Sequence, residues 1–128
     1  MMKTRSFLLL PGFLGILVSC NPVERDCAQF KTGTFESETF LNGELVKSKS
    51  VRNDSMEIDY FMGKSDTSMI RWINDCEYIG TKLHPKSRND QKPLHIKILT
   101  TDDAVFTFEY GYVGDKKNKQ KGTAKKIN

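Results

Sequence analysis

The sequence predicts an all-β domain, an eight-stranded antiparallel meander closed or nearly closed into a small barrel and preceded by a short helical turn. Apolar and polar residues alternate along short segments, and groups of turn-forming residues separate these segments at intervals of about ten residues. No helical periodicity extends beyond the first turn or two. The alternative arrangement for the same pattern is a two-sheet β-sandwich.

The expected elements follow one another from residue 24 onward. Residues 24–30 favour one or two helical turns, which Gly33 can end. Asn42-Gly43 is a strong hairpin signal, because both central residues of a type I′ turn need positive φ angles. The expected strands are 34–41, 44–52, 56–62, 69–73, 76–83, 94–98, 105–113 and 122–127, with turns at 53–54, 63–66, 74–75 and 101–103 and a polar loop at 84–93.

One face of the predicted sheet is apolar and aromatic, and we expect it to point inward. A filled core is the simplest interpretation, because an eight-stranded barrel is just wide enough for its own side chains. Phe108→Ala would then cost about 3–5 kcal/mol. The alternative is an apolar pocket for a lipid-like ligand, near Tyr60, Trp72, Phe106, Phe108 and Tyr110. The inward face comprises Met56, Ile58, Tyr60, Met62, Ile96, Ile98, Phe106, Phe108, Tyr110 and Tyr112, with Glu57 and Asp59 on the opposite, polar face.

The first twenty residues have the layout of a secretory signal, with two basic residues before an apolar core at 7–18. The segment Leu17-Val18-Ser19-Cys20 resembles the lipobox of bacterial lipoproteins. This resemblance implies that residues 1–19 are removed and that Cys20 is acylated. The apolar core rises only about 18 Å, which is too short for a hydrocarbon layer of about 30 Å. We therefore expect a tether at 20–26 and a single domain at 27–128.

The expected location is the cell envelope, where the lipid on Cys20 anchors the protein to a membrane. Asn21 after the acylated cysteine favours the outer membrane over the inner one. Cys27 and Cys76 then lie in an oxidising compartment as the remaining pair, and we expect a structural disulfide between them. Closing that loop is worth about 4 kcal/mol in the chain-entropy model. A redox or metal pair is the alternative, but neither cysteine has a close Cys or His partner.

The net charge of +4 does not indicate nucleic-acid binding. Two positive charges belong to the signal, and the remaining excess is concentrated near the C-terminus. We expect Lys116, Lys117, Lys119 and Lys121 in a solvated loop, with contact to an anionic surface as the alternative. Arginine is absent from this cluster, which argues against bidentate phosphate recognition.

Signatures of catalysis are missing from the sequence. It contains no His-Glu-x-x-His, Gly-x-Ser-x-Gly or Gly-x-x-x-x-Gly-Lys motif. His84 and His95 are expected to face solvent, and Asp102-Asp103 is expected in a turn. We therefore predict a protein that is not an enzyme and that needs no cofactor or metal.

Two resemblances extend beyond the signal. Thr32-Gly33-Thr34-Phe35 is similar to the Gly-x-aromatic start of the first strand in lipocalin-type barrels, in which a short helix comes before the strand. The mature chain also resembles a group of small, uncharacterised bacterial envelope lipoproteins, which implies a lipocalin-like fold and a location but no activity. Some of these carry a type II topoisomerase label, which a small exported domain cannot support. The landmarks are Thr32-Gly33-Thr34-Phe35, Arg71-Trp72-Ile73-Asn74-Asp75-Cys76-Glu77-Tyr78, Phe108-Glu109-Tyr110-Gly111-Tyr112 and Gly122-Thr123-Ala124.

Three functions remain open on this basis. The first is a membrane-anchored, non-enzymatic lipoprotein that acts through contacts with an envelope protein. The second is a lipocalin-like binder of a small apolar ligand. The third is an inhibitor of an envelope hydrolase.

Overall fold

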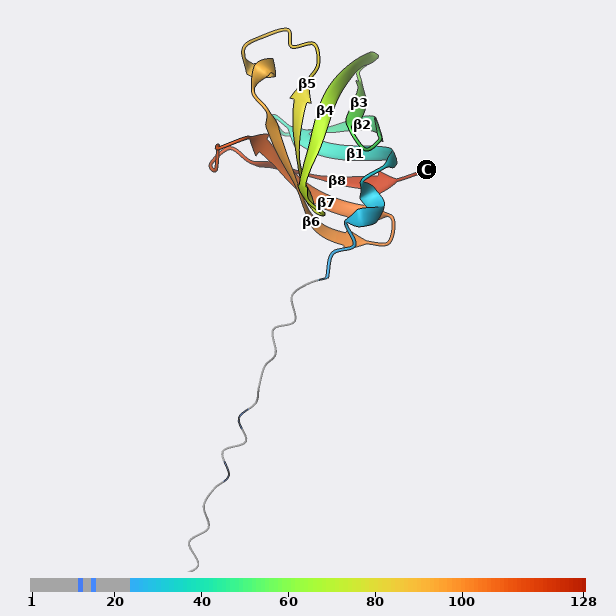
Figure 1. Cartoon of the computed structure of the whole chain (residues 1–128), viewed down its shortest axis with the longest axis vertical. Helices are drawn as coiled ribbons and strands as arrows, with labels where there is room; N and C mark the ends of the chain where they lie inside the picture. Colours follow the sequence, from blue (N-terminus) through green and yellow to red (C-terminus); the bar gives the residue numbers. More distant parts are fainter. Residues whose placement is uncertain (1–11, 13–14, 16–23) are drawn as a thin grey trace, which may run out of the picture.

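Eight antiparallel strands form a closed barrel, in which each strand pairs with the next one along the chain and β8 pairs with β1 (Figure 1). The computed structural model describes Gly12, Gly15 and residues 24–128. The predicted meander is therefore confirmed, and its closure excludes the alternative of two separate packed sheets. The strands are β1 (Gly33–Leu41), β2 (Glu44–Arg52), β3 (Met56–Phe61), β4 (Lys64–Asn74), β5 (Glu77–Lys82), β6 (Leu94–Asp102), β7 (Val105–Tyr112) and β8 (Gln120–Lys126).

Tight turns set the strand limits at one end of the barrel. Asn42 and Gly43 have φ angles of 52° and 80°, as the predicted hairpin between β1 and β2 requires. Met62 and Gly63 make a similar turn between β3 and β4, with φ angles of 50° and 74°. Because this turn needs only two residues, β4 begins at Lys64, and the turn predicted at 63–66 is wrong. Met62 adopts this left-handed conformation although it carries a Cβ atom, and its side chain is 82% exposed.

The opposite end of the barrel is closed by η1 (Ala28–Phe30), a single 3-10 turn within the predicted helical segment 24–30. Phe30 is fully buried, and its ring centroid lies 4.6 Å from that of Phe106. In Figure 1 this short blue turn lies on the opposite side of the barrel from the β5–β6 connection, which carries the second 3-10 turn, η2 (Asn89–Gln91). The buried core at the closed end consists of Cys27, Phe30, Phe35, Ile98, Phe106 and Ala124.

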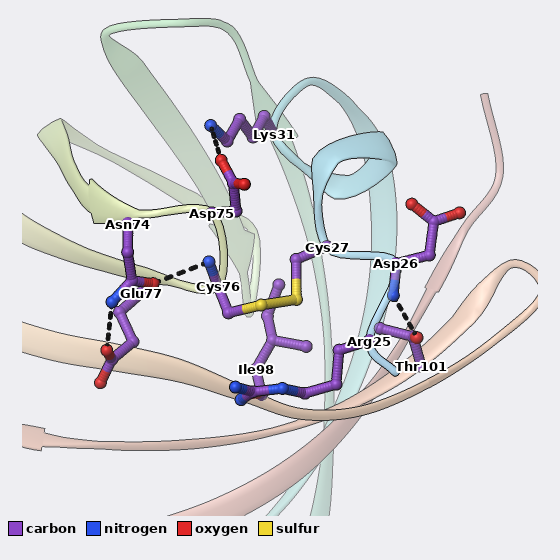
Figure 2. The surroundings of a disulfide bond; sticks show 10 residues. All are labelled: Arg25, Asp26, Cys27, Lys31, Asn74, Asp75, Cys76, Glu77, Ile98 and Thr101. Atoms are coloured by element: carbon purple, nitrogen blue, oxygen red, sulfur yellow. Dashed lines mark hydrogen bonds and ion pairs between the residues drawn. A yellow bond between two sulfur atoms is a disulfide. The ribbon is translucent and has the colours of Figure 1, made fainter. Parts of the chain in front are cut away.

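Cys27 and Cys76 form the predicted disulfide, with an S–S distance of 2.06 Å (Figure 2). It joins the residue before η1 to the turn between β4 and β5. Two contacts also hold the neighbouring segments. Lys31 Nζ lies 2.9 Å from Asp75 (Figure 2), and the Arg25 guanidinium donates to the Ile98 carbonyl at 2.8 Å. These bonds fix η1 against two parts of the barrel, the turn between β4 and β5 and strand β6.

The predicted signal peptide, apart from Gly12 and Gly15, lies outside the described residues, and so do the lipobox and Cys20. The described part of the tether, residues 24–26, reaches the barrel at its closed end, where the Asp26 amide donates to Thr101 Oγ1 at 2.8 Å. Among the described residues, no helix is long and apolar enough to cross a membrane.

Candidate functional site

The half of the barrel away from η1 contains a cavity of about 380 Å³. It reaches from Arg52 and Tyr78 above the closed end to Leu41, Phe61 and the β5–β6 connection, which we call the mouth. A well-packed protein interior has few voids larger than a water molecule, whereas small-molecule sites typically occupy about 300–1,000 Å³. The interior is therefore filled at one end and hollow at the other, which answers the question that the sequence left open.

The cavity has one apolar wall and one polar wall. The apolar wall comes from β6 and β7, on which inward side chains alternate with outward ones. The polar wall comes mainly from β1 to β4, where short hydroxyl side chains replace the large ones found elsewhere. The apolar wall consists of Leu94, Ile96, Phe106, Phe108, Tyr110 and Tyr112, and the polar wall includes Ser37, Thr39, Ser48, Ser50, Ser68, Glu57 and Asp59.

Two glycines help to keep this space open. Gly80 lies on the lining, and a Cβ atom added there would meet only the Ile96 side chain, at 3.9 Å. Gly122 on β8 is in a tighter place, because a Cβ atom there would lie 2.6 Å from both Phe108 and Thr39. Gly122 thus permits the close packing of Phe108, while Gly80 borders empty space.

A buried ion pair lies at the inner end of the cavity, next to the closed end of the barrel, which we call the floor. Arg52 Nε donates to Glu57 Oε2 at 2.9 Å, and these residues are only 6% and 9% exposed. Arg52 Nη1 donates to the Phe30 carbonyl at 2.6 Å, and Nη2 donates to the Tyr78 hydroxyl at 3.0 Å. The Tyr78 hydroxyl in turn donates to Glu57 Oε2 at 3.0 Å. Each nitrogen of the guanidinium therefore has a partner, as a buried charge requires.

The pKa values of this cluster follow from burial and from the charges within it. Burial opposes the ionisation of Glu57, but the charge and hydrogen bond of Arg52 outweigh it, so the pKa of Glu57 is lowered. Burial likewise opposes the charge of Arg52, and the groups of Tyr78 and Glu57 reverse this effect, so its pKa is raised. For Tyr78, burial raises the pKa well above its usual range.

Asp59 lines the cavity next to this ion pair and titrates differently from Glu57. Burial first, and then the negative charge of Glu57, raise the pKa of Asp59 to about 8. The Asp59 carboxyl is therefore mainly protonated at neutral pH. Arg52 has already neutralised Glu57, so the second carboxyl has no cation of its own at the floor.

The predicted pocket residues separate into three groups. Phe106, Phe108 and Tyr110 line the cavity. Trp72 is not part of the lining; it packs near the closed end, with its ring centroid 4.7 Å from that of Tyr78. Tyr60 lies on the outside of the barrel and is 45% exposed.

The inward face predicted for β3 is wrong. Glu57, Asp59 and Phe61 point into the barrel, so Met56, Ile58 and Tyr60 point out, and Met62 lies in an exposed turn. Strict alternation fixes which residues share a face, but not which face is inside. The buried partner of Glu57 is Arg52, which faces it from the paired position on β2 and makes the polar face tolerable inside.

Arg52, Glu57, Asp59 and Tyr78 are the functional candidates that the sequence reasoning missed. A usable signal lies in the first hairpin, where Ser48 and Ser50 alternate with Lys47 and Lys49. Because lysines face solvent, the small hydroxyl residues and Arg52 must face inward. That pattern indicates a polar interior.

The four predicted surface lysines lie together in the β7–β8 loop and the start of β8, and all are exposed. Lys119 Nζ contacts Glu109 at 3.3 Å, while Asp115 accepts hydrogen bonds from the amides of Lys117 and Asn118 and shapes the loop. Lys116, Lys117 and Lys119 thus lie in an exposed loop and Lys121 lies on β8, and their contact with an anionic surface stays a prediction.

The comparisons with known proteins leave the cavity as the main guide to function. No family model, no curated protein and no solved structure matches this chain. Among the described residues, no group of three or more His, Cys, Asp or Glu side chains is placed to hold a metal ion.

Proposed function

We propose that this protein binds a small amphipathic ligand inside the barrel, and that acylated Cys20 tethers it to a membrane of the cell envelope. The observation that carries the proposal is the cavity of about 380 Å³ with its apolar and polar walls. Such a combination, an apolar surface with a few convergent polar groups, is typical of small-molecule sites. The cavity also has an access route, because Phe61 and Tyr112 at its mouth are both exposed.

Filling the cavity is the direct test of binding. Gly80→Leu places a side chain in the empty space beside Ile96, and its backbone conformation does not require glycine. The fluorescence of N-phenylnaphthylamine, a neutral apolar probe, should rise when the protein is added. The affinity of the protein for this probe should be at least tenfold lower in the Gly80→Leu variant. The matched control is Gly111→Leu, because Gly111 alternates with Tyr110 and Tyr112 and therefore faces outward. Equal binding by both variants, or no binding by the wild-type protein, would reject the interior site.

The lipid anchor has its own test. Labelled palmitate fed to cells should enter the wild-type protein and should not enter Cys20→Ala. Label that enters both proteins equally, or neither, would reject the anchor. The result is independent of the cavity, because the described tether joins the barrel at its closed end.

A second candidate function, contact with an envelope protein partner, is favoured by the outer face of β2 to β4. The outward position of the β3 side chains leaves an apolar surface there. Val51 pairs with Ile58 and Met56 pairs with Met69 across adjacent strands, and Tyr60 continues the surface toward the mouth. Val51, Tyr60 and Met69 are each more than one third exposed. Exposed apolar patches of this kind mark interaction sites.

Crosslinking in cells tests this second function. A photoreactive residue at Tyr60 or Met69 should give one discrete adduct, whereas the same residue at Glu36, exposed on the outer face of β1, should give none. Adducts of equal pattern from all three positions would reject a specific partner on this face.

A further inference from the structure

We propose that the cavity selects cationic amphiphiles, with a protonated amine of the ligand bound by Asp59 and its apolar part against the Phe108–Tyr110 wall. This inference rests on the proposed interior binding site and specifies its ligand class.

The positive groups of the polar wall are already paired with carboxylates. Arg52 at the floor pairs with Glu57 at 2.9 Å. Lys82, nearer the mouth, contacts Asp66 at 2.9 Å and Asp90 at 3.2 Å. An anionic ligand would have to compete with these carboxylates, and taking Arg52 away from Glu57 would leave a buried carboxylate without its cation.

Asp59 is the carboxyl of this wall that no described cation balances. The charged groups facing it are Glu57 on its own strand, Arg52 on β2 and Asp66 on β4. Arg52 is already paired with Glu57, and Asp66 is already paired with Lys82. The lining carries three carboxyl groups, those of Glu57, Asp59 and Asp90, and Asp59 is the one of the three with no ion-pair partner among the described residues.

A third cation of the lining, Lys92, lies at the mouth. Lys92 Nζ lies 5.4 Å from the centroid of the Tyr112 ring, on the apolar side of the opening. A ligand whose anionic group is bound by Lys92 would remain at the mouth. Its apolar part would then lie outside the cavity or against the polar wall. A ligand that enters with its apolar part along the aromatic wall brings its polar end toward Asp59 instead.

The facing wall suits the rest of such a ligand. The rings of Phe106, Phe108 and Tyr110 follow one another at centroid distances of 5.9 Å each. These rings offer an apolar surface, and their faces also attract an adjacent ammonium group. The two walls thus match the two ends of an aromatic or alkyl amine.

Proton exchange accompanies this binding. In the empty cavity the Asp59 carboxyl holds a proton, because its pKa is raised to about 8 by burial and by Glu57. When an ammonium ion arrives, Asp59 ionises to pair with it and the proton passes to the buffer. Amine binding should therefore strengthen as the pH rises from about 6 to about 8, while binding of a neutral ligand should not.

Three probes with one ring system test the inference: naphthylmethylamine, naphthylmethanol and naphthoic acid. Titration calorimetry of the full chain at about pH 7 should give an affinity for the amine at least tenfold above that for the alcohol, with the acid weakest. Repeating the amine titration in buffers of different ionisation enthalpy should reveal net release of close to one proton. Asp59→Asn, which resembles the protonated carboxyl, should remove the amine preference and the proton release but keep the alcohol affinity. The matched control is Asp54→Asn, in the exposed β2–β3 turn.

The outcomes separate this inference from the function on which it rests. If the acid binds as tightly as the amine, or if Asp59→Asn keeps the amine preference, cation selectivity is wrong and interior binding stands. If none of the three probes binds and N-phenylnaphthylamine is insensitive to Gly80→Leu, both the selectivity and the interior site are rejected.

Discussion

The two ends of the barrel are built from the same eight strands, yet one is packed and the other is hollow. At the closed end, Phe30 from η1 meets Phe35 and Phe106, and large side chains fill the section. Toward the mouth, Ser37 and Ser48 take the inward positions on β1 and β2. The contrast teaches that dense packing and open space are divided along the barrel axis, so that changes at one end need not disturb the other.

The largest expected effect comes from removing a ring at the closed end. Phe35→Ala leaves a void among fully buried side chains and should lower the free energy of unfolding by about 3–5 kcal/mol. Phe108→Ala should cost only about 1–2 kcal/mol, because Phe108 borders the cavity and is partly exposed to it. Urea unfolding of both variants measures the difference, and equal losses would contradict the division between packed and hollow halves.

The next effect comes from the disulfide, which belongs entirely to the closed end. Replacing Cys27 and Cys76 by serine opens a loop with a sequence separation of 49 residues and should cost about 2–4 kcal/mol. Affinity of the folded variant for N-phenylnaphthylamine should stay within about twofold, since neither cysteine lines the cavity. A large loss of affinity in the folded variant would show that the two ends are coupled.

A pH-dependent effect belongs to the cavity end. Asp59 has a folded pKa of about 8, above its unfolded value, so its protonated form stabilises the fold. This contribution is complete below about pH 4 and is lost as the pH rises to about 8, with a slope of at most about 1.4 kcal/mol per pH unit. The lowered pKa of Glu57 acts in the opposite direction at acidic pH. In thermal unfolding, the stability of the Asp59→Asn variant should decline less between about pH 5 and 8 than that of the wild-type protein. An unchanged dependence of stability on pH would refute the raised pKa of Asp59.

The smallest expected effect concerns the ion pair at the surface of the closed end. Lys31 and Asp75 lie 2.9 Å apart, but Asp75 is 79% exposed, so solvent screens their attraction. Asp75→Asn should lower stability by about 0.2–1 kcal/mol, and by less in high salt. A cost above about 2 kcal/mol would mean that charge, and not packing with the disulfide, holds this end together.

The barrel could be predicted from the sequence because its signals are local. Asn42-Gly43 specifies a turn by its own backbone preference, and β2 occupies the predicted range 44–52 without change. Cys27 and Cys76 could be paired by elimination, since the predicted signal assigned the third cysteine to lipid attachment. These inferences needed no knowledge of which strands lie opposite one another inside the barrel.

The cavity could not be predicted, because it depends on which face of each strand turns inward. Met56, Ile58 and Tyr60 are apolar and alternate regularly, so hydrophobicity alone places them inside. The opposite orientation is stable because Glu57 bonds to Arg52 on the paired strand β2 and to Tyr78 on β5, and the Tyr78 contact joins residues that are distant in sequence. A hollow section likewise depends on the summed volumes of side chains from several strands, which no single segment reveals.

The attachment of η1 also determines how the barrel responds to tension. Tension on the chain before Cys27 would not peel β1 away from β8, because the disulfide passes the force directly to the turn between β4 and β5. Arg25 and Asp26 share the same load with β6 through Ile98 and Thr101. The force is thus shared between the β4–β5 turn and β6 at the closed end of the barrel. The mouth of the cavity carries none of it. A domain held in this way can be pulled from residues 24–26 without loading its cavity.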